Sequence, residues 1–148
     1  MLVRPYLDSD HDSVVSLWNE CGLVVPWNNP DHEIMLKRQV QDDLFLVGEY
    51  GQEVVATAMA GYDGHRGWLY LIGVQPRFQG RGFGRQIVEE AVRRLSALGC
   101  RKVNLQIRES NLQVRSFYER LGFQNDNVIG MGLRLQTPGN KPPSEIDA

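Results

Sequence analysis

Residues 74–85 read Val74-Gln75-Pro76-Arg77-Phe78-Gln79-Gly80-Arg81-Gly82-Phe83-Gly84-Arg85, and this segment carries the strongest indication of the fold. A strand-like apolar run from Leu69 ends at Pro76, and a periodic helical pattern begins near Phe83. Glycines at three alternate positions allow positive φ and a close approach of the backbone to a ligand. The N–H groups and the positive dipole end at a helix start attract an anion. The stretch therefore predicts a phosphate-binding turn, and three arginines add positive charge to it: Arg77, Arg81 and Arg85.

The glycine spacing excludes two common phosphate loops. A Gly-x-Gly-x-x-Gly loop needs a glycine where Arg85 or Ile87 stands, and a P-loop needs a Gly-Lys-Ser/Thr that does not follow. Residues 79–84 instead fit the pattern (Gln/Arg)-x-x-Gly-x-(Gly/Ala). This pattern resembles the loop of the GCN5-related N-acetyltransferase (GNAT) superfamily, which holds the pyrophosphate of acetyl-coenzyme A. The resemblance implies that the cofactor-binding residues here are Gln79, Gly80, Arg81, Gly82, Phe83, Gly84 and Arg85.

A second block strengthens the resemblance. Residues 102–108 read as a strand, Ser110 and Gln113 have the spacing of a capping box, and an apolar i, i+3, i+4, i+7 pattern follows up to Gly122. Asn111 and Tyr118 are seven residues apart and so share one side of this predicted helix. The block is similar to the second signature segment of GNAT enzymes. The similarity implies that Asn111 contacts the pantetheine arm and that Tyr118, beside the thioester sulfur, is the general acid.

The order of predicted elements is also that of a GNAT fold. Residues 2–7 read as a strand. A first helix follows, with N-caps offered at 8–10 and an end at Gly22, and a second helix lies at about 32–41. Three strands follow at 44–50, 53–62 and 68–74. After the helix at 83–98 we expect a fifth strand, the Tyr118 helix, and two last strands near Phe123 and at 128–135. The fold class is thus α/β, with a mixed, mostly antiparallel sheet splayed between its fourth and fifth strands and flanked by about four helices. We expect one domain over residues 1–136 and a disordered tail over 137–148.

The splayed gap implies further site residues. In the family this gap admits pantetheine, so Ile72 and Val74 on the fourth strand are expected to contact it. Gly73 in mid-strand indicates a bulge, and a backbone N–H around Gly73-Val74 is the expected oxyanion donor. Trp27, Tyr62 and Asp63 are candidates for lining the acceptor site. The segments around Trp27 and over residues 61–67 resemble small bacterial YpeA-type acetyltransferases.

The two positions of the family's usual glutamate base hold Gln106 and Trp68. Deprotonation through water, relayed by Glu33, Glu49 or Asp63, stays open. An acceptor with an α-amine needs less help than a lysine, because its pKa is lower. The acceptor itself, whether a peptide α-amine, a lysine, a polyamine or an amino acid, is not decided by the sequence.

Composition limits the remaining classes. The 148 residues are 42% hydrophobic and 23% charged, with a net charge of −2, which is typical of a globular domain without a basic surface for nucleic acid. We expect no signal peptide, no membrane span, no metal and no disulfide between Cys21 and Cys100. A cytoplasmic monomer or homodimer is the expectation.

The leading hypothesis is an acetyl-CoA-dependent N-acetyltransferase that moves an acetyl group to a primary amine by direct attack in a ternary complex. A non-catalytic acyl-CoA-binding or regulatory module is the alternative, favoured by the missing glutamates. A phosphate-binding domain for another nucleotide is the third possibility, and the second signature block argues against it.

Overall fold

The computed structural model describes residues 1–135, and the predicted tail over 137–148 lies outside this range. The helices and strands follow the expected order up to the Tyr118 helix. They are β1 (Leu2–Pro5), a 3-10 turn (Asp8–Asp10), α1 (His11–Glu20), α2 (Pro30–Val40), β2 (Phe45–Tyr50), β3 (Glu53–Tyr62), β4 (Gly67–Val74), a second 3-10 turn (Pro76–Phe78), α3 (Phe83–Ala97), β5 (Val103–Asn104) and α4 (Leu112–Arg120).

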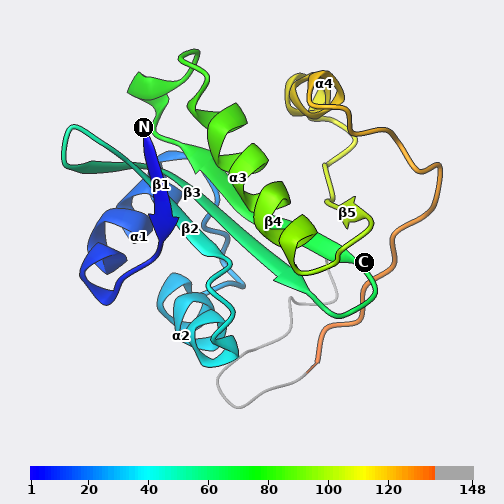
Figure 1. Cartoon of the computed structure of the whole chain (residues 1–148), viewed down its shortest axis with the longest axis horizontal. Coiled ribbons are helices and arrows are strands. Elements are labelled where there is room, and N and C mark those ends of the chain that lie inside the picture. The colour runs from blue at the N-terminus through cyan, green and yellow to red at the C-terminus, as the bar shows by residue number, and fades with distance from the viewer. Residues whose placement is uncertain (136–148) are drawn as a thin grey trace.

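The five strands form one sheet in the order β1-β2-β3-β4-β5. The first four strands pair antiparallel, whereas β5 pairs parallel to β4. The parallel ladder contains only the pairs Gly67–Val103 and Trp68–Asn104, although β4 continues to Val74. Figure 1 shows that the chain after β5 and the whole of α4 lie away from the sheet. The predicted mixed sheet, splayed between β4 and β5, is confirmed.

Two apolar cores lie on the two faces of this sheet. Helices α1 and α2 cover one face and α3 crosses the other (Figure 1). The alanines of β3 pack under α3, because Ala56, Ala58 and Ala60 leave room for the fully buried Ile87 and Leu95. On the opposite face Trp18 stacks on Phe45, with 5.9 Å between ring centroids. Because side chains pack closely on both faces of the sheet, β4 is held in a fixed position. The part of β4 after Trp68 lies beside the region where β5 has separated from it.

A β-bulge interrupts β4 before that far half. Thr57 is paired with Gly73 and Met59 with Tyr70, so Leu71 and Ile72 together face the single residue Ala58. Leu71 takes up the extra residue with a φ of 48°. The expected bulge at Gly73 is therefore two residues too late. Gly73 has a different purpose, because a Cβ there would lie 3.0 Å from Leu23 Cδ1.

Two local predictions near the C-terminus are wrong. Asn111, not Ser110, is the N-cap of α4, and its Oδ1 accepts a hydrogen bond from the Val114 N–H at 3.3 Å. No strand forms in the described residues 121–135, where apolar side chains stay largely exposed: Val128, Ile129, Met131, Leu133 and Leu135. Alternation of apolar residues produces a strand only beside a partner edge, and the ladder of β5 ends at Asn104.

Candidate functional site

The predicted phosphate loop forms the connection between β4 and α3. Gly80 and Gly82 both have a φ of 80°, and Gly82 is the N-cap of α3. A side chain at either position would be strained, because L-residues cost about 1–2 kcal/mol in this region. A Cβ at either glycine would meet nothing within 4 Å, so the space above the loop is open. The N–H groups at the start of α3 therefore face an accessible surface that suits a pyrophosphate.

Aromatic side chains hold this loop on the end of the sheet. Phe78 and Phe83 lie 5.8 Å and 5.1 Å from the Tyr50 ring centroid, and 6.2 Å from one another. The Gln79 amide donates a hydrogen bond to the Val74 carbonyl at 3.1 Å. The loop is thus anchored by its apolar and amide side chains, while its glycines leave the outer surface open. Gln79, expected to contact phosphate, is bonded to β4 here.

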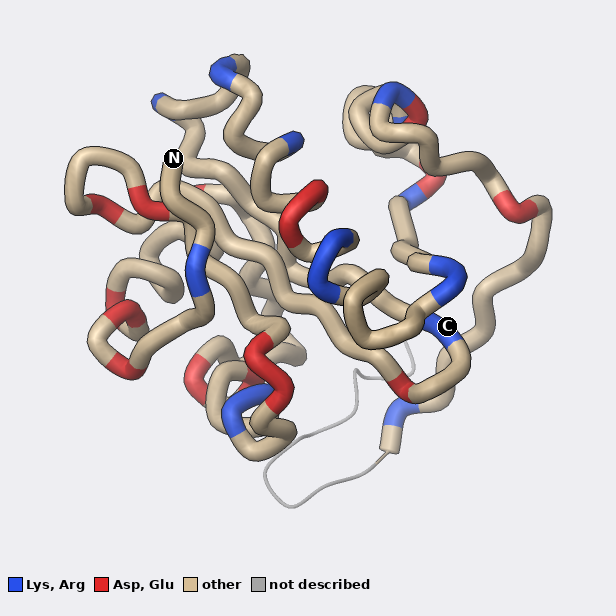
Figure 2. The backbone as a smooth tube through the Cα atoms, viewed as in Figure 1, with Lys and Arg blue, Asp and Glu red and all other residues tan. Residues whose placement is uncertain are grey.

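The three arginines of the loop differ in their contacts. Positively charged residues follow the loop and the first turn of α3 (Figure 2). Arg77 bonds Glu53, and Arg85 Nε lies 2.7 Å from Glu89 Oε1. Arg77 and Arg81 both lie over the Phe78 ring, 4.7 Å and 5.2 Å from its centroid, but the Arg77 guanidinium is also engaged by Glu53. A planar guanidinium held on an aromatic face keeps its N–H groups at the rim for an anion, so Arg81 is the arginine best placed to bind phosphate.

Gly84 is the point where the loop, β4 and α4 meet. A Cβ on this residue would lie 3.3 Å from Phe117 Cζ and 3.6 Å from Val74 Cγ2. The absence of a side chain thus lets the first turn of α3 approach α4 closely. Phe117 in turn packs against Tyr118, with ring centroids 4.9 Å apart. The glycine therefore brings the predicted anion-binding loop next to the residue expected to act as general acid.

The far end of β4 is tied down at the Val74 carbonyl. This oxygen accepts hydrogen bonds from Gln79 Nε2 and from Cys21 Sγ, the second at 3.2 Å. Burial raises the pKa of the Cys21 thiol, so this cysteine is a packing group at neutral pH. Ile72 and Val74 both pack against the core on the α3 side of the sheet. They lie beyond the last β4–β5 pair, where the prediction of cofactor contacts requires them.

Tyr118 is buried on α4, with 8% of its surface exposed. Its ring lies between Phe117 and Phe123, 5.5 Å from the centroid of Phe123. Burial raises the pKa of its phenol to about 12, so the group holds its proton throughout the physiological range. Asn111 caps the same helix and is exposed. The two residues predicted from the second signature block are thus carried by one helix at the open side of the sheet.

The expected acceptor residues have contacts of their own. Trp27, in the loop between α1 and α2, lies under the Arg134 guanidinium at 5.3 Å from the ring centroid. The Tyr62 hydroxyl donates a hydrogen bond to the Gly64 carbonyl at 3.2 Å, and its ring packs on the α3 side. The Asp63 carboxylate accepts 2.7 Å hydrogen bonds from the His65 and Arg66 N–H groups. Within residues 1–135, no hydrogen bond or ring contact links Trp27 to Tyr62 or Asp63.

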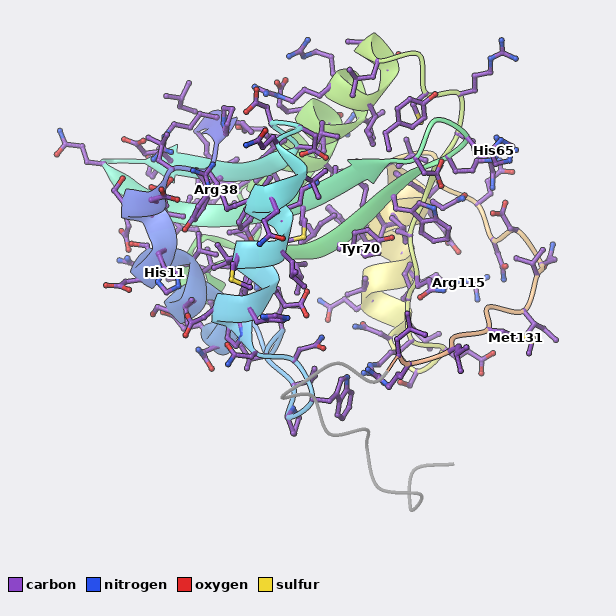
Figure 3. The ribbon with its side chains drawn as sticks, turned by 90° about the horizontal axis from the view of Figure 1, so that it is seen from below. His11, Arg38, His65, Tyr70, Arg115 and Met131 are labelled. Carbon is purple, nitrogen blue, oxygen red and sulfur yellow. The ribbon has the colours of Figure 1, made fainter. Side chains whose placement is uncertain are left out.

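Of the carboxylates considered as bases, Glu49 is bonded to Arg4 on β1, with 3.0 Å between Oε2 and Nε. The N–H of Arg66 and then that of His65 lower the pKa of Asp63, which makes it a weak base. Glu33 is half-buried on α2. Trp68, at one usual position of the base, stacks on Tyr70 at 6.3 Å. Figure 3 shows Tyr70 on the sheet and Arg115 on α4.

Sequence reasoning missed Leu71, Thr57 and Phe117. Only Gly73 carried a signal of the bulge, and it pointed two residues too late.

Among residues 1–135, no group of three metal-binding side chains lies close enough to hold an ion. In the same range no helix has the length and hydropathy to cross a bilayer.

Solved structures with the same fold include acetyltransferases of several kinds. One is glucosamine-6-phosphate N-acetyltransferase from Arabidopsis thaliana, with 25% identity and a TM-score of 0.69 over 91% of this chain and 98% of that one. Another is the ribosomal-protein-S18-alanine N-acetyltransferase from Escherichia coli, with 21% identity and a TM-score of 0.71 over 83% and 77%. A third is AAC(6')-Iy in complex with a CoA-containing bisubstrate analog, with 19% identity and a TM-score of 0.72 over 90% and 98%.

The match to a protein family covers both signature blocks, the glycine loop and the segment that carries Tyr118. Residues 11–123 match the family described as "Acetyltransferase (GNAT) family". This range extends from α1 to the end of the Tyr118 helix and includes every element that forms the gap. The finer likeness to YpeA-type enzymes stays a prediction. The chain belongs to the GNAT acetyltransferase family.

Proposed function

We propose that this chain transfers an acetyl group from acetyl-CoA to a primary amine, by direct attack of the amine on the thioester. The loop Gln79–Gly84 with the start of α3 binds the pyrophosphate, and Arg81 adds charge. The edge of β4 at Ile72 and Val74, with Asn111 opposite, holds the pantetheine arm. Tyr118 donates the proton to the departing thiolate.

One observation carries this proposal, namely the contact between α3 and α4 at Gly84. A cofactor whose pyrophosphate lies at the start of α3 needs its reactive end beside a proton donor. Gly84 sets Phe117, and with it Tyr118, against the first turn of α3. The same contact includes Val74 at the end of β4. The three parts that acetyl transfer requires are therefore adjacent, although they are distant in sequence.

The protonation states fit the reaction. A phenol with a pKa of about 12 is fully protonated at neutral pH and is therefore available as a donor. Transfer to the thiolate, whose thiol has a pKa of about 8.5, is uphill by about 3.5 pKa units, and the phenolate that it leaves regains its proton from water. The amine must lose its proton before it attacks. At pH 7 this costs about 4.6 kcal/mol for a lysine and about 1.4 kcal/mol for an α-amine.

The acceptor class follows from the lack of a strong base. Trp68 and Gln106 stand at the usual positions of the glutamate, and Glu49 and Asp63 are engaged elsewhere. Glu33 remains as a carboxylate for deprotonation through water. An amine of low pKa is therefore favoured over a lysine. Of the similar structures, one is named for acetylating an alanine of a ribosomal protein and another for an amino sugar phosphate.

Calorimetric titration with acetyl-CoA tests the cofactor site. The wild type should bind in the micromolar range, and Gly82→Asp should abolish binding, because the carboxylate would repel the pyrophosphate at a position whose φ is 80°. Gly99→Asp is the matched control. Gly99 also has a positive φ, 90°, and an open Cβ site, but it follows the opposite end of α3. It should lose stability without losing affinity.

A panel of amines with a thiol-release assay tests the reaction. Release that depends on the amine supports the transferase, and α-amines should exceed lysine side chains at pH 7. Tight binding without any amine-dependent release would support the non-catalytic module instead. Absence of acetyl-CoA binding by the wild type would refute both.

A further inference from the structure

A buried polar chain braces the bulge of β4 from the side opposite α3. Trp18 on α1 donates its indole N–H to Thr57 Oγ1 at 3.0 Å, and Thr57 donates its hydroxyl to the Leu71 carbonyl at 3.1 Å. Thr57 and Trp18 are both fully buried. A threonine hydroxyl has one proton to donate, so with these two bonds its direction is fixed. Water does not compete for a hydroxyl buried in this way.

The residue that receives this hydrogen bond is the strained residue of the bulge. Leu71 has a φ of 48° without being a glycine, a conformation that persists only where the surroundings enforce it. The two-to-one register also displaces its carbonyl from the β3–β4 ladder. A partly buried carbonyl that has left the ladder needs another donor, and Thr57 supplies one. The side chain of β3 therefore replaces the ladder bond that the bulge removes.

The bond to the Leu71 carbonyl also sets the direction of the next N–H. The Leu71–Ile72 peptide is planar and trans, so its N–H points opposite to its carbonyl. The carbonyl points at Thr57 on the α1 side of the sheet, and the Ile72 N–H therefore points away from β3. That direction is toward the side where β4 and β5 have separated.

We propose that Thr57, backed by Trp18, is a positioning residue that aims the Ile72 N–H at the thioester carbonyl oxygen. This inference rests on the proposed acetyl transfer and moves its oxyanion donor from Gly73-Val74 to Ile72. Thr57 touches neither substrate nor the reacting atoms. It acts through the Leu71–Ile72 peptide, which otherwise could rotate as the strain at Leu71 relaxes. A donor held in place before the reaction stabilises the charge that develops on the oxygen.

The test compares Thr57→Val, which keeps the shape and removes the hydroxyl, with Thr57→Ser, which keeps the hydroxyl. Val47→Ala is the control: Val47 on β2 is buried and paired with Thr57, so this substitution loosens the packing beside Thr57 but leaves its hydroxyl in place. Acetyl-CoA and free CoA are titrated into each full-length protein. Only acetyl-CoA has the thioester carbonyl. Thr57→Val should weaken acetyl-CoA about tenfold and leave CoA unchanged, since one well-placed hydrogen bond is worth about a factor of ten.

Turnover and the Ile72 amide give two further readouts. Thr57→Val should lower kcat at least tenfold, whereas Thr57→Ser should remain within about twofold of the wild type. In the ligand-free protein, the ¹⁵N–¹H signal of Ile72 should shift and its hydrogen exchange should accelerate in Thr57→Val only. Equal affinities and kcat for Thr57→Val and Val47→Ala would overturn the proposal.

The outcomes separate this proposal from the proposed function. If the wild type binds no acetyl-CoA, the proposed transferase function is refuted. The NMR signal and hydrogen exchange of the Ile72 amide then still test whether Thr57 holds the Leu71–Ile72 peptide. A signal and exchange rate that are the same in Thr57→Val and the wild type would refute the brace. A change in Thr57→Val that is absent in Thr57→Ser and in Val47→Ala would support it.

Discussion

Tyr118→Phe removes one hydroxyl from a buried ring and should change the pH dependence of stability. Burial raises the phenol pKa from 10 to about 12 in the folded state. Below pH 10 both states keep the proton, so the stabilisation from this group is fully present there. As the pH rises from 10 through 12 the unfolded state ionises first, and this stabilisation is lost. Its upper limit is about 2.7 kcal/mol for two pKa units.

Urea unfolding at pH 8 and pH 11 measures the effect. With pKa values of 10 and about 12, the wild type should lose about 1.4 kcal/mol at pH 11 that Tyr118→Phe does not lose. The difference between the two proteins cancels every other group that titrates. A difference in unfolding free energy that is the same at pH 8 and pH 11 would refute the assignment of a raised pKa to this phenol.

The same substitution tests catalysis. Tyr118→Phe should lower turnover at least tenfold with little change in acetyl-CoA affinity, because the proton is needed only when the thiolate leaves. The wild-type rate should show no alkaline decline from this residue below pH 10, since its pKa is about 12. Unchanged turnover in Tyr118→Phe would remove the phenol from the mechanism.

Two further substitutions test the packing that supports the site. Gly73→Ala should destabilise the protein by about 1–3 kcal/mol in urea unfolding, because its Cβ would lie 3.0 Å from Leu23 and 3.1 Å from Cys21 Sγ. Gly61→Ala on β3, where a Cβ meets nothing within 4 Å, should be neutral or stabilising; an equal loss in both would contradict the packing argument. Asp10→Asn should cost about 1–3 kcal/mol at pH 7, because the buried carboxylate accepts Arg4 Nη1 at 2.8 Å. The Arg4 guanidinium lowers the pKa of Asp10, so this stabilisation is lost as the pH falls below the ordinary pKa of an aspartate. The unfolding free energies of wild type and Asp10→Asn should therefore converge in acid, and a constant difference between them would be evidence against the ion pair.

Local signals predicted most of the fold well. The hairpin of β2 and β3, the helix after the glycine loop and the helix that carries Tyr118 were expected from periodicity and turn residues, and all are present. These elements are determined by nearby residues, so a pattern in the sequence is enough. The strands expected near Phe123 and at 128–135 are wrong, because a strand needs a partner edge that its own sequence does not supply.

The candidate site was predicted in its parts but not in its assembly. Gly80 and Gly82 adopt the positive φ that their spacing suggested, and Tyr118 and Asn111 share one helix. The contact of Gly84 with Phe117 joins positions more than thirty residues apart, and no local pattern encodes it. Likewise the bulge at Leu71-Ile72 is hydrogen-bonded to Thr57 on another strand, and Thr57 to Trp18 on α1, contacts that no local pattern encodes.

Local sequence patterns were enough to indicate the family, the order of the elements up to the Tyr118 helix and the positive-φ glycines between β4 and α3, because glycine spacing, helix starts and apolar periodicity act over a few residues. Tertiary structure decided which backbone N–H faces the gap, how the phenol of Tyr118 is held protonated, and that β5 leaves β4 after two pairs. These properties depend on register, burial and hydrogen bonds between distant segments, and such quantities exist only once the chain is packed.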